Sequence, residues 1–457
     1  MTETVYDMVI LGAGSGGYAA ALRGAQLGLK VALVEADKVG GTCLHRGCVP
    51  TKAVLHAAET AEAVREAGAL GIQAAFEGVD MAGVQKYKNG IVSRMYKGLE
   101  GLVSSRGIEV VHGWGRLVDP RTVEVDGRRL SGKNVILASG SYAKTIGQEI
   151  SGGVMTSEEA LELDHVPASA IILGGGVIGV EFASAWASLG SQVTIIEGLP
   201  HLVPNEDEAI SKQLERAFRK RKIAFHTNTM FESVERHEGG VTVRTADGKT
   251  YDAEVLLIAV GRGPATKDLG YEEAGIAMDR GFVLTDEHCR TNVEGVWAVG
   301  DIVPGVQLAH RGFAQGIAVA ERIAGLDPQP VDDNLVPKVT FCEPEIASVG
   351  LSEAKAVEIH GRDSVTTAEF NVAGNAKSQI LGTQGFVKLV SLKDGPILGF
   401  HAIGTRMGEQ VGEGQLMVSW EADAQDVASL IHAHPTQNET LGEAAMALAG
   451  KPLHNHG

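Results

Sequence analysis

Short apolar runs, each followed by a glycine-rich turn and a stretch rich in small residues, organise the first part of the chain. Residues 5–11 read Val-Tyr-Asp-Met-Val-Ile-Leu, which predicts a buried strand. The glycines that follow predict a turn, and residues 15–29 predict a helix. Residues 31–35 predict a second strand that ends in Glu35. The order strand, helix, strand is typical of a parallel α/β unit.

The same pattern occurs a second time. Residues 170–173 predict a strand, residues 180–189 a helix, and residues 192–197 a second strand that ends in Glu197. The first glycine of the turn precedes the acid by 23 residues in both copies (35 − 12 and 197 − 174). One glycine fingerprint is weak evidence, but two copies in the same context at the same spacing predict two dinucleotide-binding modules.

The residue types of these turns fit a dinucleotide. The first glycine allows a tight turn, the second lets the backbone approach a pyrophosphate, and the third lets helix and strand pack closely. They are Gly12, Gly14 and Gly17 in the first module and Gly174, Gly176 and Gly179 in the second. The acid at the strand end accepts hydrogen bonds from ribose hydroxyls. Glu197 would repel a 2′-phosphate and residues 198–204 contain no arginine, so the second module favours NAD. The alternative is that these glycine turns only allow helix and strand to pack and bind no ligand, and that Glu35 and Glu197 are solvated carboxylates at strand ends.

Residues 40–52, Gly-Gly-Thr-Cys-Leu-His-Arg-Gly-Cys-Val-Pro-Thr-Lys, contain two cysteines five positions apart. In one straight helix Cys43 and Cys48 would be roughly 7.5 Å apart along the axis and on different faces, so a bridge requires a break, which Gly47 permits. A helix that starts at Pro50 places Cys48 at its positive end, and Lys52 adds charge nearby, which favours a reactive thiolate. A redox pair is therefore predicted.

Two core thiols, or half of a zinc site, are the alternatives to a redox pair. A zinc site requires a second pair of ligands. Cys289 and Cys342 are isolated in the sequence, so they offer no such pair and are expected to be small buried residues.

Composition and charge exclude several classes of partner. No apolar run approaches the roughly 18 residues of a membrane-spanning helix. The net charge of −17 disfavours nucleic acid and anionic membranes but is compatible with a basic protein partner. Four cysteines in 457 residues fit a reducing compartment. With no export signal ahead of the first strand, a cytoplasmic location is expected.

Near the carboxyl end, His434 and Glu439 are five positions apart in His-Ala-His-Pro-Thr-Gln-Asn-Glu. A histidine titrates near neutral pH, and a carboxylate partner fixes its tautomer and stabilises the imidazolium. His434 is therefore expected to be a general acid and base that is held by Glu439. A metal site that includes His432 and an inert surface histidine are the alternatives.

Several further stretches carry a resemblance. They are residues 138–141 (Ala-Ser-Gly-Ser), 259–264 (Ala-Val-Gly-Arg-Gly-Pro), 291–301 (ending in Gly-Asp), 308–310 (Leu-Ala-His) and 344–350 (Pro-Glu-Ile-Ala-Ser-Val-Gly). Together with the glycine turns, the cysteine pair and residues 432–439, they make the chain resemble the pyridine nucleotide-disulfide oxidoreductases over essentially its full length. Within that family it is similar to the branch that oxidises dihydrolipoamide.

The resemblance implies an α/β fold with two Rossmann-like dinucleotide-binding domains, for FAD and NAD, and a C-terminal α+β dimerisation domain. The FAD-binding domain would comprise residues 1–147 and 272–337, the NAD-binding domain residues 148–271, and the interface domain residues 338–457.

The resemblance also implies roles for single residues. FAD would contact Gly12, Gly14, Gly17, Glu35, Thr42, Lys52, Ser139, Gly140, Asp301 and Ala309, and NAD would contact Gly174, Gly176, Gly179, Glu197, Gly261 and Arg262. Lys52 would pair with Glu181 beside the flavin. Cys43 would exchange with substrate and Cys48 would lie nearer the flavin. His434, with Glu439, would act on the cysteine pair of the other subunit of a homodimer.

The activity so implied is oxidation of protein-bound dihydrolipoamide with reduction of NAD. The partners would be the lipoyl domain of an acyltransferase and the E2 core of a 2-oxo acid dehydrogenase complex. Another NAD(P)H-dependent low-molecular-weight disulfide reductase is the alternative, and an assembly role would come in addition. His45 and Arg46 replace the more frequent Asn-Val of the redox motif, and we hypothesise that His45 tunes Cys43.

Overall fold

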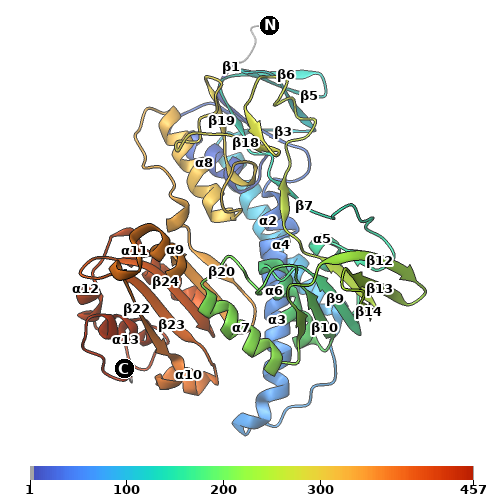
Figure 1. Cartoon of the computed structure of the whole chain (residues 1–457). Coiled ribbons are helices and arrows are strands. Elements are labelled where there is room, and N and C mark those ends of the chain that lie inside the picture. Colours follow the sequence, from blue (N-terminus) through green and yellow to red (C-terminus); the bar gives the residue numbers. More distant parts are fainter. Residues whose placement is uncertain (1–4, 456–457) are drawn as a thin grey trace. The chain divides into compact units, whose positions relative to one another are not determined.

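The computed structural model describes residues 5–455, and these form two compact units (Figure 1). The first unit comprises residues up to 54 together with 82–144 and 262–333. The second comprises residues 55–81, 145–261 and those from 334 onward. Each unit is therefore assembled from segments that are distant in the sequence.

The first unit is built on a seven-stranded sheet in the order β3-β2-β1-β6-β5-β4, with β19 paired to β6. The parallel strands are β1 (Val5–Leu11), β2 (Val31–Glu35), β3 (Glu109–His112), β6 (Arg128–Leu137) and β19 (Val296–Ala298), and β4 (Gly115–Asp119) and β5 (Thr122–Val125) form an antiparallel extension. Their side chains form two cores, since residues such as Val9 and Ile10 are fully buried on opposite faces.

Helices α1 (Ser15–Gln26) and α8 (Ala309–Ile323) pack closely against each other in this unit. The close approach depends on glycine, because a Cβ atom on Gly316 would lie 2.2 Å from the carbonyl oxygen of Gly16. The cysteine segment forms α2 (Gly41–His45) and the start of α3 (Cys48–Glu66), and α4 (Met81–Ser105) follows. The sheet and these helices position the first cofactor module.

The second unit contains a parallel sheet in the order β11-β10-β9-β15-β8. Its strands are β8 (Val154–Met155), β9 (Ser169–Leu173), β10 (Gln192–Ile196), β11 (Ala224–His226) and β15 (Val255–Ile258), with helices α6 (Val177–Leu189) and α7 (Glu208–Lys220). A three-stranded antiparallel sheet of β12 (Phe231–His237), β13 (Gly240–Thr245) and β14 (Thr250–Ala253) packs on it through a shared apolar core. Within the parallel sheet, β9, α6 and β10 form the second copy of the strand, helix, strand module.

The same unit contains an antiparallel sheet in the order β20-β21-β24-β23-β22. Its strands are β20 (Lys338–Thr340), β21 (Glu345–Gly350), β22 (Val365–Asn371), β23 (Phe386–Leu392) and β24 (Ile397–Gly404). Helices α11 (Val411–Ser419), α12 (Ala424–Ala428) and α13 (Glu439–Leu448) cover one face around the buried Phe400 and Leu441.

The remaining elements are short. They are β7 (Ser141–Ala143), β16 (Arg262–Pro264), β17 (Met278–Asp279), β18 (Phe282–Val283), α5 (Ser157–Ala160), α9 (Glu353–His360), α10 (Ala376–Leu381), and the 3-10 turns η1 (Ala67–Leu70), η2 (Gly300–Ile302), η3 (Asp333–Leu335), η4 (Arg362–Ser364), η5 (Val372–Gly374) and η6 (Met407–Glu409).

The predicted fold class is confirmed: two Rossmann-like modules are followed by an α+β domain. Two helices begin earlier than predicted, α3 at Cys48 rather than Pro50 and α6 at Val177 rather than residue 180. Proline is tolerated in the first helical turn, where its missing N–H has no intrahelical partner. Across residues 5–455 no helix has the length and apolarity needed to cross a membrane. The three domain boundaries stay predictions.

Candidate active site

The two glycine turns have the same geometry. Gly12 and Gly174 have φ of +104° and +106°, a left-handed conformation that favours glycine. A Cβ atom on Gly17 would lie 1.8 Å from the Gly12 carbonyl oxygen, and one on Gly179 would lie 1.9 Å from that of Gly174. Any larger residue would therefore push helix and turn apart in both modules.

The helix that follows each turn has an open amino end. Gly14 is the N-cap of α1 and Gly176 is the N-cap of α6, both with extended backbone and without a side-chain cap. A Cβ atom at either position would meet no atom within 4 Å. Uncapped first-turn N–H groups that face open space form an anion site. The residues present therefore fit a pyrophosphate in both modules.

The strand-end acids hold these turns in place. Glu35 accepts hydrogen bonds from the N–H groups of Ala13 (2.8 Å) and Asp37 (2.8 Å). Glu197 accepts the equivalent bonds from Gly175 (2.6 Å) and Leu199 (2.7 Å). An ionised carboxylate has about four lone-pair sites, so each acid retains acceptor capacity for ribose hydroxyls.

The cysteine segment packs directly against the first glycine turn. The Gly40 N–H donates to the Ala13 carbonyl (2.8 Å), and a Cβ atom on Gly41 would lie 2.7 Å from the Cα of Gly14. Helix α2 ends at His45 and α3 begins at Cys48, so the backbone breaks between the two cysteines as predicted. At the break, a Cβ atom on Gly47 would lie 3.0 Å from the Thr42 carbonyl oxygen.

The break brings the two thiols into contact. The hydrogen bond with Cys48 and burial raise the pKa of the Cys43 thiol, and the charge of Lys52 opposes this rise. Burial and the neighbouring Cys43 and Cys48 raise the pKa of Tyr18, on α1, to about 12. Since the thiolate is the nucleophile, a Cys43 with a raised pKa needs a base to react.

His45 and Arg46 anchor this segment to the turn after β2. The His45 Nε2 atom lies 2.9 Å from the Val39 carbonyl oxygen, and its ring contacts Tyr96 edge-on with 5.0 Å between centroids. Arg46 forms an ion pair with Asp37 at 2.6 Å. These contacts give both residues a structural function, and tuning of Cys43 by His45 stays a prediction.

Asp301, on η2, belongs to a chain of polar contacts. Its carboxylate accepts a hydrogen bond from the Ser141 hydroxyl (2.5 Å), and the Arg262 Nε donates to the same hydroxyl (2.7 Å). The Gly300 N–H donates to the amide oxygen of the buried Gln315 (2.8 Å), which fixes the turn. The roles predicted for Asp301 and Arg262 stay predictions, but the residues lie together.

Ser141 and Gln315 were not among the predicted site residues. Gln315 is a buried polar residue of α8, and no helix was predicted there from the sequence that could have indicated it. The other predicted residues of this region lie in ordered contacts: the Tyr271 hydroxyl donates to Ser139 (2.9 Å), and the Ala265 N–H donates to the Gly140 carbonyl (2.9 Å). Ala309 is the first residue of α8.

Glu181 lies in the second unit, on α6, and is 3% exposed. Its Oε1 accepts a hydrogen bond from the Phe341 N–H at 2.8 Å. Lys52 belongs to the first unit, so the predicted Lys52–Glu181 pair stays a prediction. Gly261 has φ of +101°, a conformation that favours glycine at the end of the second module.

His434 and Glu439 are hydrogen bonded, with 2.8 Å between Nδ1 and Oε1. Burial opposes ionisation of Glu439, but the Thr436 N–H and His434 hold its pKa below the usual value. The His434 side chain is 72% exposed, so its other ring nitrogen is accessible. His432 bonds a different carboxylate, Glu413 (2.9 Å), and residues 5–455 contain no cluster of three or more His, Cys, Asp or Glu fit to hold a metal.

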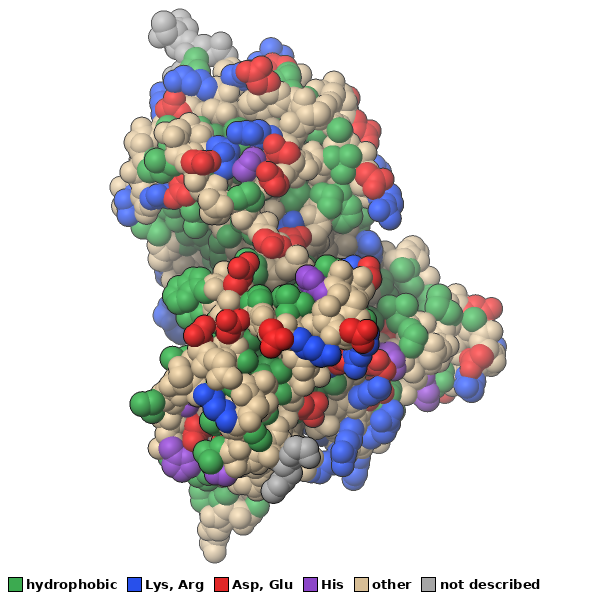
Figure 2. All heavy atoms as spheres, turned by 60° about the vertical axis from the view of Figure 1, so that its left-hand side comes forward, with side chains coloured by type: hydrophobic (Ala, Val, Ile, Leu, Met, Phe, Trp, Pro, Cys, Tyr) green, Lys and Arg blue, Asp and Glu red, His purple; other side chains and the backbone are tan. Residues whose placement is uncertain are grey.

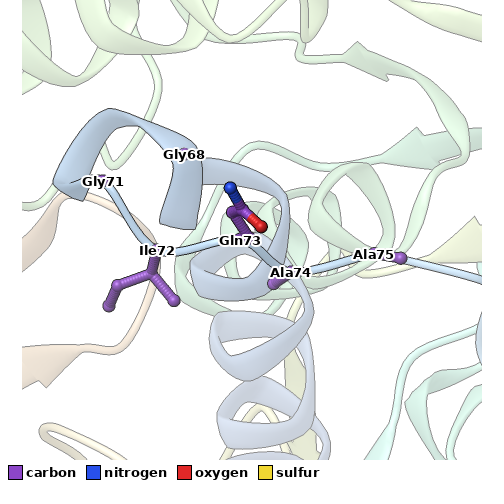
Figure 3. A pocket seen from close by; sticks show the side chains of 6 residues that line it. All are labelled: Gly68, Gly71, Ile72, Gln73, Ala74 and Ala75. Carbon is purple, nitrogen blue, oxygen red and sulfur yellow. The ribbon is translucent and has the colours of Figure 1, made fainter.

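A surface hollow of about 680 Å³ lies after α3, lined by Gly68, Gly71, Ile72, Gln73, Ala74 and Ala75 (Figure 3). Only Ile72 and Gln73 have side chains larger than a methyl group. The lining offers one amide and no ionisable group, so it does not match redox or dinucleotide chemistry. The residues suited to dinucleotide binding and redox chemistry are those of the glycine turns and the cysteine pair.

The structure has two dinucleotide-binding modules, and the cysteine segment packs against the first of them. This combination defines an oxidoreductase that depends on flavin and nicotinamide. The sequence matches the family described as pyridine nucleotide-disulphide oxidoreductase over residues 6–316 and its dimerisation domain over residues 336–445. The chain belongs to the pyridine nucleotide-disulphide oxidoreductase family.

Similar proteins extend over nearly the whole chain. A dihydrolipoyl dehydrogenase of Bacillus subtilis is 39% identical over 99% of both chains, and the mitochondrial dihydrolipoyl dehydrogenase 1 of Arabidopsis thaliana is 37% identical over 98% of this chain and 91% of its own. The crystal structure of LpdA from Mycobacterium tuberculosis superposes with a TM-score of 0.90 at 26% identity, covering 96% of this chain and 99% of the other. The HOCl-induced flavoprotein disulfide reductase RclA of Escherichia coli gives 0.86 at 28% identity, covering 96% and 99%.

These findings confirm the predicted family, enzyme class and cofactors. The chain is an oxidoreductase that uses FAD and NAD, and its carboxyl-terminal part is a dimerisation domain. When FAD and NAD are bound, they carry the electron pair between the dithiol and the nicotinamide.

Proposed function

We propose that the chain oxidises protein-bound dihydrolipoamide to lipoamide and reduces NAD to NADH, as the E3 component of a 2-oxo acid dehydrogenase complex. The observation that carries the proposal is the thiol pair of Cys43 and Cys48, which packs on the glycine turn of the first module. Relatives named dihydrolipoyl dehydrogenase at 36–39% identity support this substrate.

The sulfur chemistry proceeds by two exchanges. His434 accepts the proton of one substrate thiol, whose thiolate attacks Cys43 of the oxidised pair, and Cys48 leaves as a thiolate. The second substrate thiol attacks the substrate sulfur that is bound to Cys43, so the lipoyl ring closes. Its proton passes to Cys43, which leaves as a thiol, while Cys48 remains a thiolate and His434 keeps the first proton. The substrate has then lost two protons and two electrons, and the electrons are held by the reduced cysteine pair.

His434 acts on the substrate thiol, and the raised pKa of Cys43 favours its protonated form once it has left the lipoyl sulfur. Glu439 holds Nδ1, so Nε2 is the atom that exchanges the proton. In the proposed homodimer, His434 of one subunit acts on the cysteine pair of its partner. Lys52 and Glu181 would form the ion pair beside the flavin.

The proposed partners are the lipoyl domain of an acyltransferase component, as substrate carrier, and the basic segment of its E2 core. The net charge of −17 favours a basic partner. Figure 2 shows acidic and basic side chains interspersed on one face, so docking there would use particular acidic residues and not one continuous acidic surface. We place the protein in the cytoplasm, where a catalytic dithiol stays in exchange with cellular thiols.

Steady-state kinetics of the purified flavoprotein test the proposal. Dihydrolipoamide with NAD should be turned over far faster than dihydrolipoamide with NADP or glutathione disulfide with NADH or NADPH. Cys43→Ser and Cys48→Ser should each abolish dihydrolipoamide oxidation while the protein still binds flavin. Preference for glutathione disulfide and NADPH would instead identify the alternative disulfide reductase, and full activity of either serine variant would refute the exchange mechanism.

A further inference from the structure

The loop that carries His434 is held at both ends by one carboxylate. The loop connects α12 to α13, and Glu413 projects toward it from α11. Glu413 Oε1 lies 2.9 Å from the Nε2 of His432, two residues before His434, and Oε2 accepts a hydrogen bond from the amide of Asn438, four residues after it. The two oxygens therefore bracket His434 in sequence.

Other contacts fix the middle of the loop. The Asn375 amide donates to the Thr436 carbonyl (3.0 Å), and the Gln437 amide donates to the Thr405 carbonyl (2.9 Å). The Ser378 hydroxyl donates to the Gln437 amide oxygen (2.5 Å). The loop is thus anchored around an exposed histidine.

His432 is much less exposed than His434. Its side chain is 10% exposed, against 72% for His434. A Cβ atom on Gly442, in α13, would lie 2.6 Å from the Nδ1 of His432, so glycine leaves the space that the ring fills. The imidazole therefore fills the space between α13 and the α11 carboxylate and connects both helices to the loop.

We infer that His432 is a positioning residue: with Glu413 and Asn438 it fixes the ends of the loop so that His434 is presented to the sulfur chemistry in one orientation. This inference rests on the proposed role of His434. It separates the functions of the two histidines of His-Ala-His, since one holds the backbone and the other transfers the proton.

Charge strengthens this arrangement. The hydrogen bond with Glu413 raises the pKa of His432, and His432 with Asn438 lowers the pKa of Glu413. The charged groups that face His432 are Glu413 from α11 and Glu439 from α13, and both favour the imidazolium. The charge-assisted bond therefore persists to higher pH than it would for a free imidazole, and it weakens as pH rises through the raised pKa of His432.

Two variants and a matched control test the inference in the holoenzyme. His432→Leu removes the donor, and we expect kcat for dihydrolipoamide to fall about 10- to 100-fold through misplacement of His434. His432→Gln keeps a neutral donor at the position of Nε2, so we expect most of kcat to remain. His454→Gln is the control, because His454 also pairs with a glutamate, Glu443, at 2.7 Å but lies outside the loop.

Electron transfer from NADH to ferricyanide requires only the cofactor sites, so all three variants should retain it. Wild-type kcat in His432→Leu would overturn the inference. A fall in kcat of His432→Gln by about 10- to 100-fold would also overturn it, because the glutamine keeps the donor, and this variant decides alone should the leucine variant fold poorly. An inactive His434→Gln with fully active His432 variants would refute only the positioning role. Wild-type protein that does not oxidise dihydrolipoamide would refute the proposed function itself.

Discussion

Lys388 is a buried cation between two carboxylates, and its removal should destabilise the second unit. Its Nζ lies 2.9 Å from Asp207 Oδ1 and 2.8 Å from Glu353 Oε2. Asp207 caps α7 of the NAD-binding module, and Lys388 lies on β23 of the antiparallel sheet. The ion pair therefore connects the NAD-binding module to the interface sheet, and Lys388→Met would break it with little change in side-chain volume.

The magnitude follows from the exposure of each partner. Removing one member of a buried ion pair costs about 3–5 kcal/mol, because the other charge remains buried. Glu353 is 27% exposed and also pairs with Arg362, so it adds little to the cost. Asp207 is 3% exposed, so leaving its charge without Lys388 accounts for most of the lost stability. We expect a loss near the lower end, about 3 kcal/mol.

The penalty should depend on pH. In the wild type, burial opposes ionisation of Asp207, but Lys388 and the Glu353 N–H hold its pKa below the usual value, so its stabilisation exists near neutral pH and is lost only in acid. Without Lys388, burial dominates and the folded-state pKa of Asp207 rises above that of the unfolded chain. The penalty is then largest at high pH, where Asp207 is ionised, and shrinks as the pH falls and Asp207 takes up a proton.

Thermal unfolding of the holoenzyme between pH 5 and pH 8 measures both effects. A loss of about 3 kcal/mol corresponds to a Tm lower by roughly 6–12 °C for a domain of about 150–250 residues. Lys393→Met, an exposed lysine just beyond β23, is the matched control and should leave Tm unchanged. A Tm difference below about 1 °C between the Lys388→Met protein and the wild type, or one that does not vary with pH, would refute the reasoning, since about 3 kcal/mol is expected.

Three further substitutions address the site. Gly17→Ala should abolish FAD binding, seen as loss of the flavin absorbance, because its methyl group would overlap the Gly12 carbonyl; a yellow variant would contradict the proposed cradle. Glu197→Gln should lower the preference in kcat/KM for NAD over NADP about 10-fold, as expected for roughly 1.4 kcal/mol of lost charge repulsion, and an unchanged ratio would remove Glu197 as the determinant. Glu439→Gln should lower kcat for dihydrolipoamide roughly 100-fold or more while NADH–ferricyanide activity persists, and a normal kcat would show that the carboxylate is not needed.

The sequence predicted those features that depend on local chemistry. Gly12 and Gly174 combine a left-handed φ with no room for a Cβ atom, a combination that only glycine meets, so they identified both modules without knowledge of the rest of the fold. The break between Cys43 and Cys48 was predicted because a bridge between cysteines at this spacing cannot form within one straight helix. Helix starts were missed by two or three residues, since Pro50 is accepted inside the first turn.

Contacts between distant segments were not predictable in this way. Lys388 and Asp207 are 181 positions apart, and each alone resembles an ordinary surface charge. Glu413 precedes His432 by 19 positions and belongs to another helix, so the sequence indicated a pair of histidines but not that they have different carboxylate partners. Such pairs form because burial makes an unpaired charge costly, and burial is a property of the whole fold.

The two modules share one backbone arrangement and differ in the segment that occupies it. The residue after the first glycine presents its carbonyl to a neighbouring segment in both: Ala13 accepts the Gly40 N–H and Gly175 accepts the Val203 N–H, each at 2.8 Å. In the first module that segment leads into the cysteine helices. In the second it is apolar, with Leu202 and Val203 almost fully buried. This hydrogen bond joins the cysteine segment to the first cradle, so the proposed assignment of that cradle to FAD places the thiols on the flavin side.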